Sequence, residues 1–184
     1  MPERLRVIVS GMIAQYPLGG MAWHYLQYVL GLRELGHDVY YLEDTAAWPY
    51  DAASGRLAEE PDRNVGYLAA LMARFGMADR WAYRVRSGGE AWWFGMSDSR
   101  RRDVVASADV LLDVSGALDR PEDYRGAGRL VFIDTDPGFV QLRLQRGEAR
   151  ERERVSAHDV HFSFGERMPG TLPDGGVRRS EEHT

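Results

Sequence analysis

The fold is decided by residues 5–44, "LRVIVSGMIAQYPLGGMAWHYLQYVLGLRELGHDVYYLED". The run at 5–13 is apolar and rich in β-branched residues, which is typical of a strand buried on both faces. Apolar residues then recur at helical spacing from Met21 to Leu35, and Gly36 follows in the usual position after a helix end. The run at 37–44 predicts a second strand. A strand, a helix and a strand in this order form a βαβ unit with parallel strands.

The rest of the chain continues the alternation of strands and helices. Buried strands are predicted at 109–116 and 129–138, with a shorter one at 80–86 and a last one at 158–166. Helices are predicted at 65–77, around 98–107 and over 139–156, whereas 44–64 and the segment leading to residue 98 are interpreted as loops. Four or five parallel-type strands with helices between them predict an α/β fold with a doubly wound, mostly parallel, Rossmann-like sheet.

Composition limits the classes of function. A chain of 184 residues with 44% hydrophobic residues is long and apolar enough for one domain with a core. The net charge of −5 gives no reason to expect nucleic acid as a partner. No cysteine is present, which excludes disulfides and thiolate metal sites. No apolar run approaches the ~18 residues of a membrane span, and the N-terminal run is interpreted as a strand instead of a signal peptide, so we expect a cytoplasmic protein.

Candidate ligand-binding residues lie at the carboxyl ends of the predicted strands, where open α/β sheets bind their ligands. They are small or acidic: Gly19, Gly20, Ser115, Asp134, Asp136 and Glu166. The glycine pair leaves backbone room at the start of a helix, whose free N–H groups attract a phosphate or a sugar hydroxyl. The alternative is that the two glycines only form a tight turn.

Known phosphate-binding fingerprints are absent. "GMIAQYPLGG" is not a GxGxxG motif, and a Walker loop is impossible because the chain has no lysine. "FIDTDPGF" suggests either a DxD metal site of sugar transferases or the aspartate nucleophile of haloacid-dehalogenase phosphatases, but it fits neither pattern well. The alternative is a strand end whose aspartates cap the next helix. We therefore expect no metal site and no cofactor.

Three further features concern histidines and aromatic residues. His24 lies in the first turns of the predicted helix and is a candidate general base, or else a partly exposed helix residue. His158 and His161 flank the start of the last strand, without the clustered carboxylates of a metal site. Trp92, Trp93 and Phe94 are placed on a glycine-flanked loop, where they either line a pocket or partner surface or pack beneath the loop.

The sequence order of a strand, "PLGG", an amphipathic helix and "LRELGHDVYYLE" resembles the N-terminal half of GT-B glycosyltransferases. The later "FIDTDPGF" and "HFSFGE" segments resemble a bacterial subgroup of such proteins, so the resemblance covers residues 5 to about 170. It implies the acceptor-side half of a two-domain enzyme that moves a sugar from a nucleotide-diphosphate donor to an acceptor. Gly19 and Gly20 would then face the donor phosphates or the acceptor, and His24 would be the base.

The same resemblance implies a C-terminal donor domain that this chain lacks, so we expect the chain alone to be inactive. Two alternatives stay open: a non-catalytic module that binds a sugar or nucleotide, and half of a GT-B-fold epimerase. Residues 1–178 are interpreted as the Rossmann-like domain. Residues 179–184, "RSEEHT", can be encoded by a sequence that resembles a sequencing adapter, and we expect them to carry no biological function.

Overall fold

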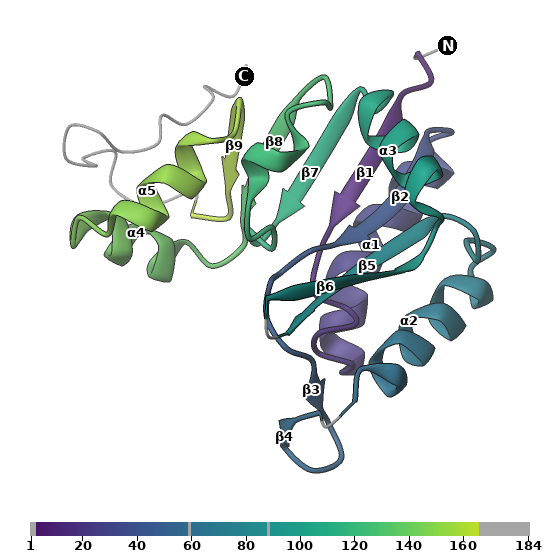
Figure 1. Ribbon diagram of the computed structural model, residues 1–184. Coiled ribbons are helices and arrows are strands. Elements are labelled where there is room, and N and C mark those ends of the chain that lie inside the picture. The colour runs from purple at the N-terminus through teal and green to yellow at the C-terminus, as the bar shows by residue number, and fades with distance from the viewer. Residues whose placement is uncertain (1–2, 59, 88, 166–184) are drawn as a thin grey trace.

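The computed structural model describes residues 3–58, 60–87 and 89–165, and it confirms the α/β, Rossmann-like prediction. One mostly parallel, seven-stranded sheet is flanked by helices on both faces (Figure 1). Its strands are β1 (Arg6–Ser10), β2 (Asp38–Glu43), β5 (Trp81–Ser87), β6 (Glu90–Gly95), β7 (Val110–Val114), β8 (Leu130–Asp134) and β9 (Val160–Ser163). The helices are α1 (Gly19–Glu34), α2 (Asp62–Arg74), α3 (Asp98–Ala106), the 3-10 helix η1 (Pro121–Tyr124), α4 (Pro137–Gln145) and α5 (Ala149–Ser156).

The strand order in the sheet is β6-β5-β2-β1-β7-β8-β9. Six of these strands are parallel, and β6 pairs antiparallel with β5 at one edge. The chain therefore starts in the middle of the sheet, builds one side as far as β6, and then returns to build the other side from β7 to β9. This is a doubly wound arrangement.

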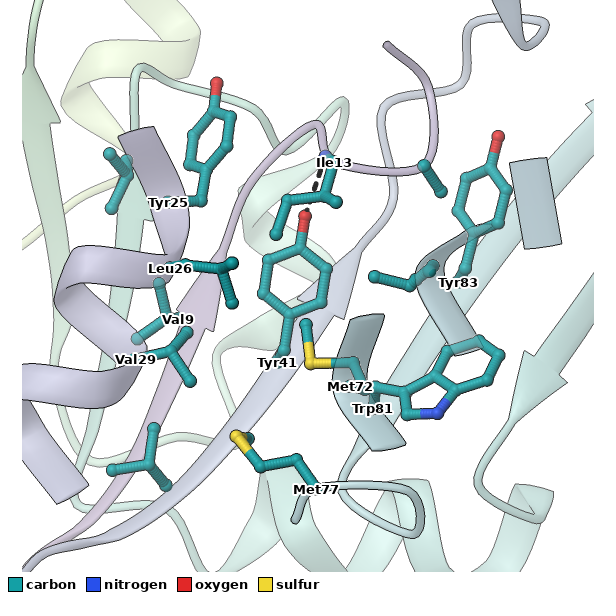
Figure 2. Packing of buried hydrophobic residues seen from close by; sticks show 14 of the residues in the cluster. Val9, Ile13, Tyr25, Leu26, Val29, Tyr41, Met72, Met77, Trp81 and Tyr83 are labelled. Carbon is teal, nitrogen blue, oxygen red and sulfur yellow. Dashed lines mark hydrogen bonds between the residues drawn. The ribbon is translucent and has the colours of Figure 1, made fainter. Parts of the chain in front are cut away.

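The side chains of the central strands enter two hydrophobic cores in alternation, because successive side chains of a strand point to opposite faces of the sheet. On one face Val9 and Tyr41 pack with Tyr25 and Leu26 of α1 and with Met72 of α2, as Figure 2 shows. On the other face, Ile8 of β1, Leu42 of β2 and Leu111 of β7 form the second core. They pack there with Val104 of α3 and Tyr124 of η1. Because helices cover both faces of the sheet, the side chains on both faces of the central strands are mostly apolar, and these strands appear as continuous apolar runs in the sequence.

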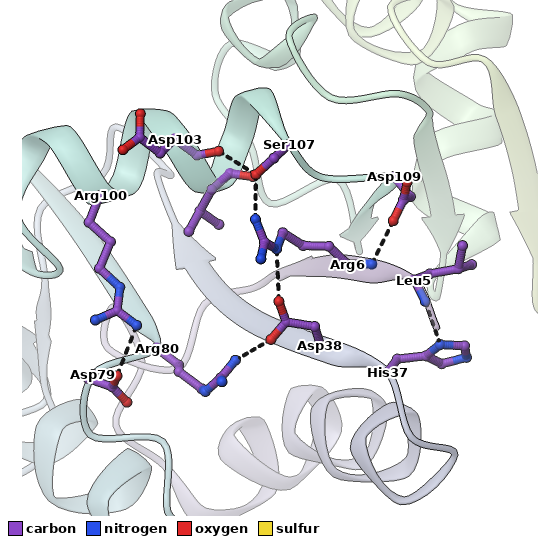
Figure 3. Close-up of polar contacts among 11 residues, drawn as sticks. Leu5, Arg6, His37, Asp38, Asp79, Arg80, Arg100, Asp103, Ser107 and Asp109 are labelled. Atoms are coloured by element: carbon purple, nitrogen blue, oxygen red, sulfur yellow. Dashed lines mark hydrogen bonds and ion pairs between the residues drawn. The ribbon is translucent and has the colours of Figure 1, made fainter. Parts of the chain in front are cut away.

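The amino ends of the strands are joined by ion pairs and hydrogen bonds (Figure 3). Asp38 accepts from Arg6 Nε at 2.8 Å and from Arg80 Nη1 at 2.5 Å. Burial opposes the charge of Asp38, but the hydrogen bonds from Arg80 and Arg6 hold its pKa below the ordinary value. The Nδ1 atom of His37 accepts from the backbone N–H of Leu5 at 3.2 Å. These contacts tie β1, β2 and the start of β5 together at the end opposite the carboxyl ends of the strands.

The structure corrects the loop prediction for the aromatic triplet. Trp92, Trp93 and Phe94 lie on β6, which pairs with β5 in the register Val85↔Trp92, Arg84↔Trp93 and Tyr83↔Phe94. Trp93 packs between two guanidinium groups, those of Arg101 at 3.9 Å and Arg84 at 5.5 Å from its ring centre. The flanking glycines mark the hairpin turn and the strand end, where Gly89 and Gly95 have φ of 88° and 90°.

Three further segments also differ from the predictions in the elements that they form. The helix predicted over 139–156 is two helices, α4 and α5, separated at Gly147, whose φ is 73°. The excursion at 44–64 contains a two-stranded ribbon of β3 (Tyr50–Asp51) and β4 (Arg56–Leu57). Helix α1 begins at Gly19, so the glycine pair lies inside its first turn. Within the described part of the chain, each helix is too short or too polar to cross a bilayer.

Candidate functional site

The connections of the sheet locate the candidate site between β1 and β7. These neighbouring strands pair in parallel from Val7↔Val110 to Ser10↔Asp113, yet the chain leaves them toward opposite edges of the sheet. In Figure 1, α1 follows β1 on one side, and the segment after β7 leads away toward β8. Such a reversal of strand order opens a crevice at the carboxyl ends, where α/β proteins bind ligands.

The loop that leaves β1 is fixed by buried side chains from β2. Tyr41 OH accepts from Ile13 N–H at 3.0 Å (Figure 2). The two carboxylate oxygens of Glu43 accept from Ala14 N–H at 2.8 Å and from Gln15 N–H at 2.5 Å. Because the backbone of this loop is bonded to groups in the sheet, the start of α1 is held in a fixed position.

Glu43 is wholly buried, and burial raises its pKa to about 7 although Ala14, Tyr41 and Gln15 hydrogen-bond to it.

The loop after β1 also requires a glycine at position 11, because a side chain there would clash. A Cβ atom at Gly11 would lie 2.5 Å from Cδ1 of Tyr25 and 3.0 Å from the hydroxyl oxygen of Tyr41. The loop therefore depends on tight packing against two tyrosines as well as on hydrogen bonds.

The crevice brings together three side chains that are far apart in the sequence. His24 Nε2 on α1 lies 3.2 Å from Ser115 Oγ, which follows β7. Ser115 Oγ lies 2.6 Å from Thr135 Oγ1, which follows β8. Burial lowers the pKa of His24, so its imidazole is neutral near pH 7 and can accept a proton. The structure thus joins the predicted base to a predicted ligand-binding residue, and adds Thr135.

Gly19 and Gly20 lie near this cluster along α1. Gly20 precedes His24 by four residues, so the two positions share one face of the helix, a turn apart. Both glycines are exposed, and a Cβ atom at either position would meet no atom within 4 Å. Neither is among the positive-φ glycines, so their backbone conformation does not require glycine. Their contact with a ligand stays a prediction.

Asp134 and Asp136 differ in environment. Asp134 is buried at the end of β8, and its Oδ1 accepts from Asp136 N–H at 3.2 Å, while its Oδ2 has no partner among the described residues. Burial raises the pKa of Asp134 to about 6, helped by the nearby charges of Asp136 and Glu151. Asp136 is exposed at the N-cap position of α4, but its side chain does not cap the helix. The capping alternative is therefore wrong for Asp136.

A groove of about 760 Å³ opens beside the same strand ends. Its walls are the loop after β1, the loop after β7 and the facing side of α4 and α5. It is lined by four arginines, Arg120, Arg143, Arg150 and Arg154, and by five acids, Asp119, Glu122, Glu148, Glu151 and Glu153. Each of these arginines is paired with an acid of the lining, for example Arg150 with Asp119 at 2.6 Å. The near-balance of charge favours a neutral, polar ligand over a polyanion.

One groove residue has an unused hydrogen-bonding atom. The side chain of Gln15 is 5% exposed and lines the groove, and its Oε1 accepts no hydrogen bond from the described residues. A buried amide oxygen without a partner is costly in an unliganded protein. The opposite wall is anchored by Arg154, whose Nη1 donates to the carbonyl of Gly116 at 2.5 Å. Sequence reasoning missed both residues, because nothing local in the sequence marks them.

Glu166 lies outside the described residues. Among the residues that the structure does describe, no group of three or more His, Cys, Asp or Glu side chains is arranged to hold a metal ion. His158 lies in the core instead, with its Nε2 3.2 Å from Asp113 Oδ2 and its Nδ1 3.0 Å from the carbonyl of Arg154. No protein-family model matches the chain, and none of the curated proteins compared with it is similar.

Proposed function

We propose that this chain is the acceptor-side half of a sugar transferase, in which His24 acts as the general base toward a hydroxyl of the acceptor. The observation that supports the proposal most is the contact of His24 Nε2 with Ser115 Oγ at 3.2 Å, beside the reversal point of the sheet. A hydroxyl already occupies the position that an acceptor hydroxyl would take. A neutral imidazole in that position can remove its proton.

The groove beside the strand ends, whose lining includes Gly116 directly after Ser115, suits a carbohydrate. The groove offers guanidinium donors and carboxylate acceptors in nearly equal number, and vicinal sugar hydroxyls both donate and accept. Gly19 and Gly20 leave the first turn of α1 open to an approaching hydroxyl or phosphate oxygen. The nucleotide-diphosphate donor belongs to a second domain in this proposal, so the chain alone forms no product. A cytoplasmic location stays part of the proposal.

The proposal is tested by NMR titration of the chain with glucose, N-acetylglucosamine and maltose, and separately with uridine diphosphate. The carbohydrates should shift the imidazole signals of His24 and the amide signal of Ser115, because both lie in the crevice. His37 serves as an internal control, since it lies at the amino ends of the strands and contacts Leu5 there. Shifts at His24 with uridine diphosphate alone would favour the nucleotide-binding module. No shift at His24 with any of these compounds would refute the assignment.

A further inference from the structure

Ser115 has an unusual backbone conformation. Its φ is 64°, and Ala46 is the other non-glycine residue with a positive φ in the described part of the chain. This region is strained for a residue with a side chain, and such strain concentrates at functional sites. A glycine would relieve the strain, yet serine occupies the position and Gly116 follows it. Strained serines at the turn after a central strand present their hydroxyl outward in hydrolases.

The contacts of Ser115 allow an arrangement in which its hydroxyl donates to a base. A hydroxyl carries one proton, and Ser115 Oγ lies within bonding distance of both His24 Nε2 and Thr135 Oγ1, while the phenol of Tyr25 is a third hydrogen-bonding partner of Ser115. When the imidazole is neutral with its proton on Nδ1, Nε2 accepts the proton of Ser115. Thr135 then donates to Ser115 Oγ. This orientation pairs a hydroxyl with a base that can deprotonate it, which is how serine nucleophiles are activated.

Backbone N–H groups are available beside Ser115. The N–H of Gly116 belongs to the residue directly after the serine, and it is not among the backbone donors that are hydrogen-bonded to another backbone group in the turns and loops of the described residues. In serine hydrolases the corresponding N–H stabilises the oxyanion of the intermediate. The N–H groups of Gly19 and Gly20 are also without a helical acceptor, since they lie in the first turn of α1. They lie one turn from His24.

We propose that Ser115 is a nucleophile activated by His24, and that it reacts with small neutral esters. Ser115 Oγ attacks the carbonyl carbon, and its proton passes to His24 Nε2. The bond from that carbon to the alcohol oxygen then breaks, and the alcohol leaves with the proton from His24. Water, deprotonated by His24, cleaves the acyl-serine and releases the acid. Phosphate esters fit less well, because Glu43, Asp113 and Asp134 place buried carboxyl groups at the neighbouring strand ends.

The test is labelling of the chain with a fluorophosphonate probe, followed by peptide mass spectrometry, together with hydrolysis of p-nitrophenyl acetate. We expect an adduct on Ser115. The adduct should disappear in Ser115→Ala and Ser115→Gly, and His24→Gln should slow labelling about 10²-fold. Ser115→Gly guards against misfolding, since glycine suits a φ of 64°. Ser99→Ala, an exposed serine on α3, should label like the unchanged chain.

The outcome separates this activity from sugar transfer. No adduct on Ser115 in folded protein, or equal labelling with and without His24, would overturn the nucleophile. A carbohydrate-dependent shift of His24 in the same sample would then leave the sugar-transfer proposal intact. Labelling of Ser115 without any carbohydrate shift would support the nucleophile and remove the transferase assignment.

Discussion

The phenol of Tyr41 donates a hydrogen bond of 2.8 Å to the carboxylate of Glu43, and both side chains lie wholly inside the protein. Tyr41 and Glu43 are two residues apart on β2, so they point to the same face of the sheet. Together they accept three backbone N–H groups from the loop that begins α1. The position of His24 therefore depends on residues of β2 that lie wholly inside the protein.

Glu43 should make stability depend on pH. Its pKa is about 7 in the folded protein, against an ordinary value of 4.5, because burial disfavours the charge. Between these values the unfolded chain loses the proton and the folded protein keeps it, so stability falls as pH rises from 4.5 to 7. The full effect is about 3 kcal/mol. The free energy of unfolding in urea should be measured for the unchanged chain and for Glu43→Gln. The value for the unchanged chain minus the value for the variant should rise as pH is lowered through this window, because glutamine does not titrate. A constant difference would contradict the raised pKa.

Replacing Gly11 by alanine should destabilise the protein. The new Cβ atom would meet the ring of Tyr25 at 2.5 Å, and both tyrosines around it are buried. Overpacking of this kind costs about 1–3 kcal/mol. Gly31→Ala is the matched control, since a Cβ atom there meets nothing within 4 Å in the interior of α1. Alanine should raise helix stability at that position by up to about 1 kcal/mol. Thermal melting of both variants checks the opposite signs.

Gly20→Val should weaken ligand binding far more than it lowers stability. Valine fits the fold, because a Cβ atom at position 20 meets no protein atom within 4 Å. If a ligand approaches the first turn of α1 as proposed, the branched side chain would fill the space that it needs. Titration with the carbohydrate that shifts His24, compared with thermal melting, measures the two effects. Equal losses of affinity and stability would assign Gly20 a purely structural role.

His24→Ala should lower sugar transfer by about 10²-fold or more in the protein that carries both halves, with little change in substrate affinity. In the proposed function the imidazole acts in the transition state, and His24 is not among the residues that line the groove. Steady-state kinetics separate turnover from affinity. His37→Ala is a suitable control at the opposite end of the sheet. Unchanged turnover in His24→Ala would exclude His24 as the base.

The fold could be predicted from residues 5–44 because local pattern and tertiary structure agree there. The loop prediction for the segment from Glu90 to Gly95 is wrong for the opposite reason. Its flanking glycines favour a loop, whereas pairing with β5 makes it a strand. The sequence does not reveal the break between α4 and α5 at Gly147, because Arg and Glu on both sides of it fit a helix. The positive φ of that glycine marks the end of α4.

The candidate site was predictable only in part. Strand ends alone place Ser115 and Asp134 at the crevice, since parallel strands end at one edge of a sheet. Contact between His24 and Ser115, which are 91 residues apart, depends on the strand order, and that order leaves no local mark in the sequence. The same holds for Gln15 and Arg154, which meet the groove through the packing of separate elements.

The anchoring of the loop after β1 has a consequence for hydrogen exchange. The amides of Ile13, Ala14 and Gln15 all donate to side chains buried within β2, and we expect solvent deuterium to reach them when β1 and β2 separate. These strands lie at the centre of the sheet, and their separation amounts to global unfolding. Three loop amides should therefore exchange as slowly as those of the central strands. Their protection would report the stability of the whole domain from a position next to His24.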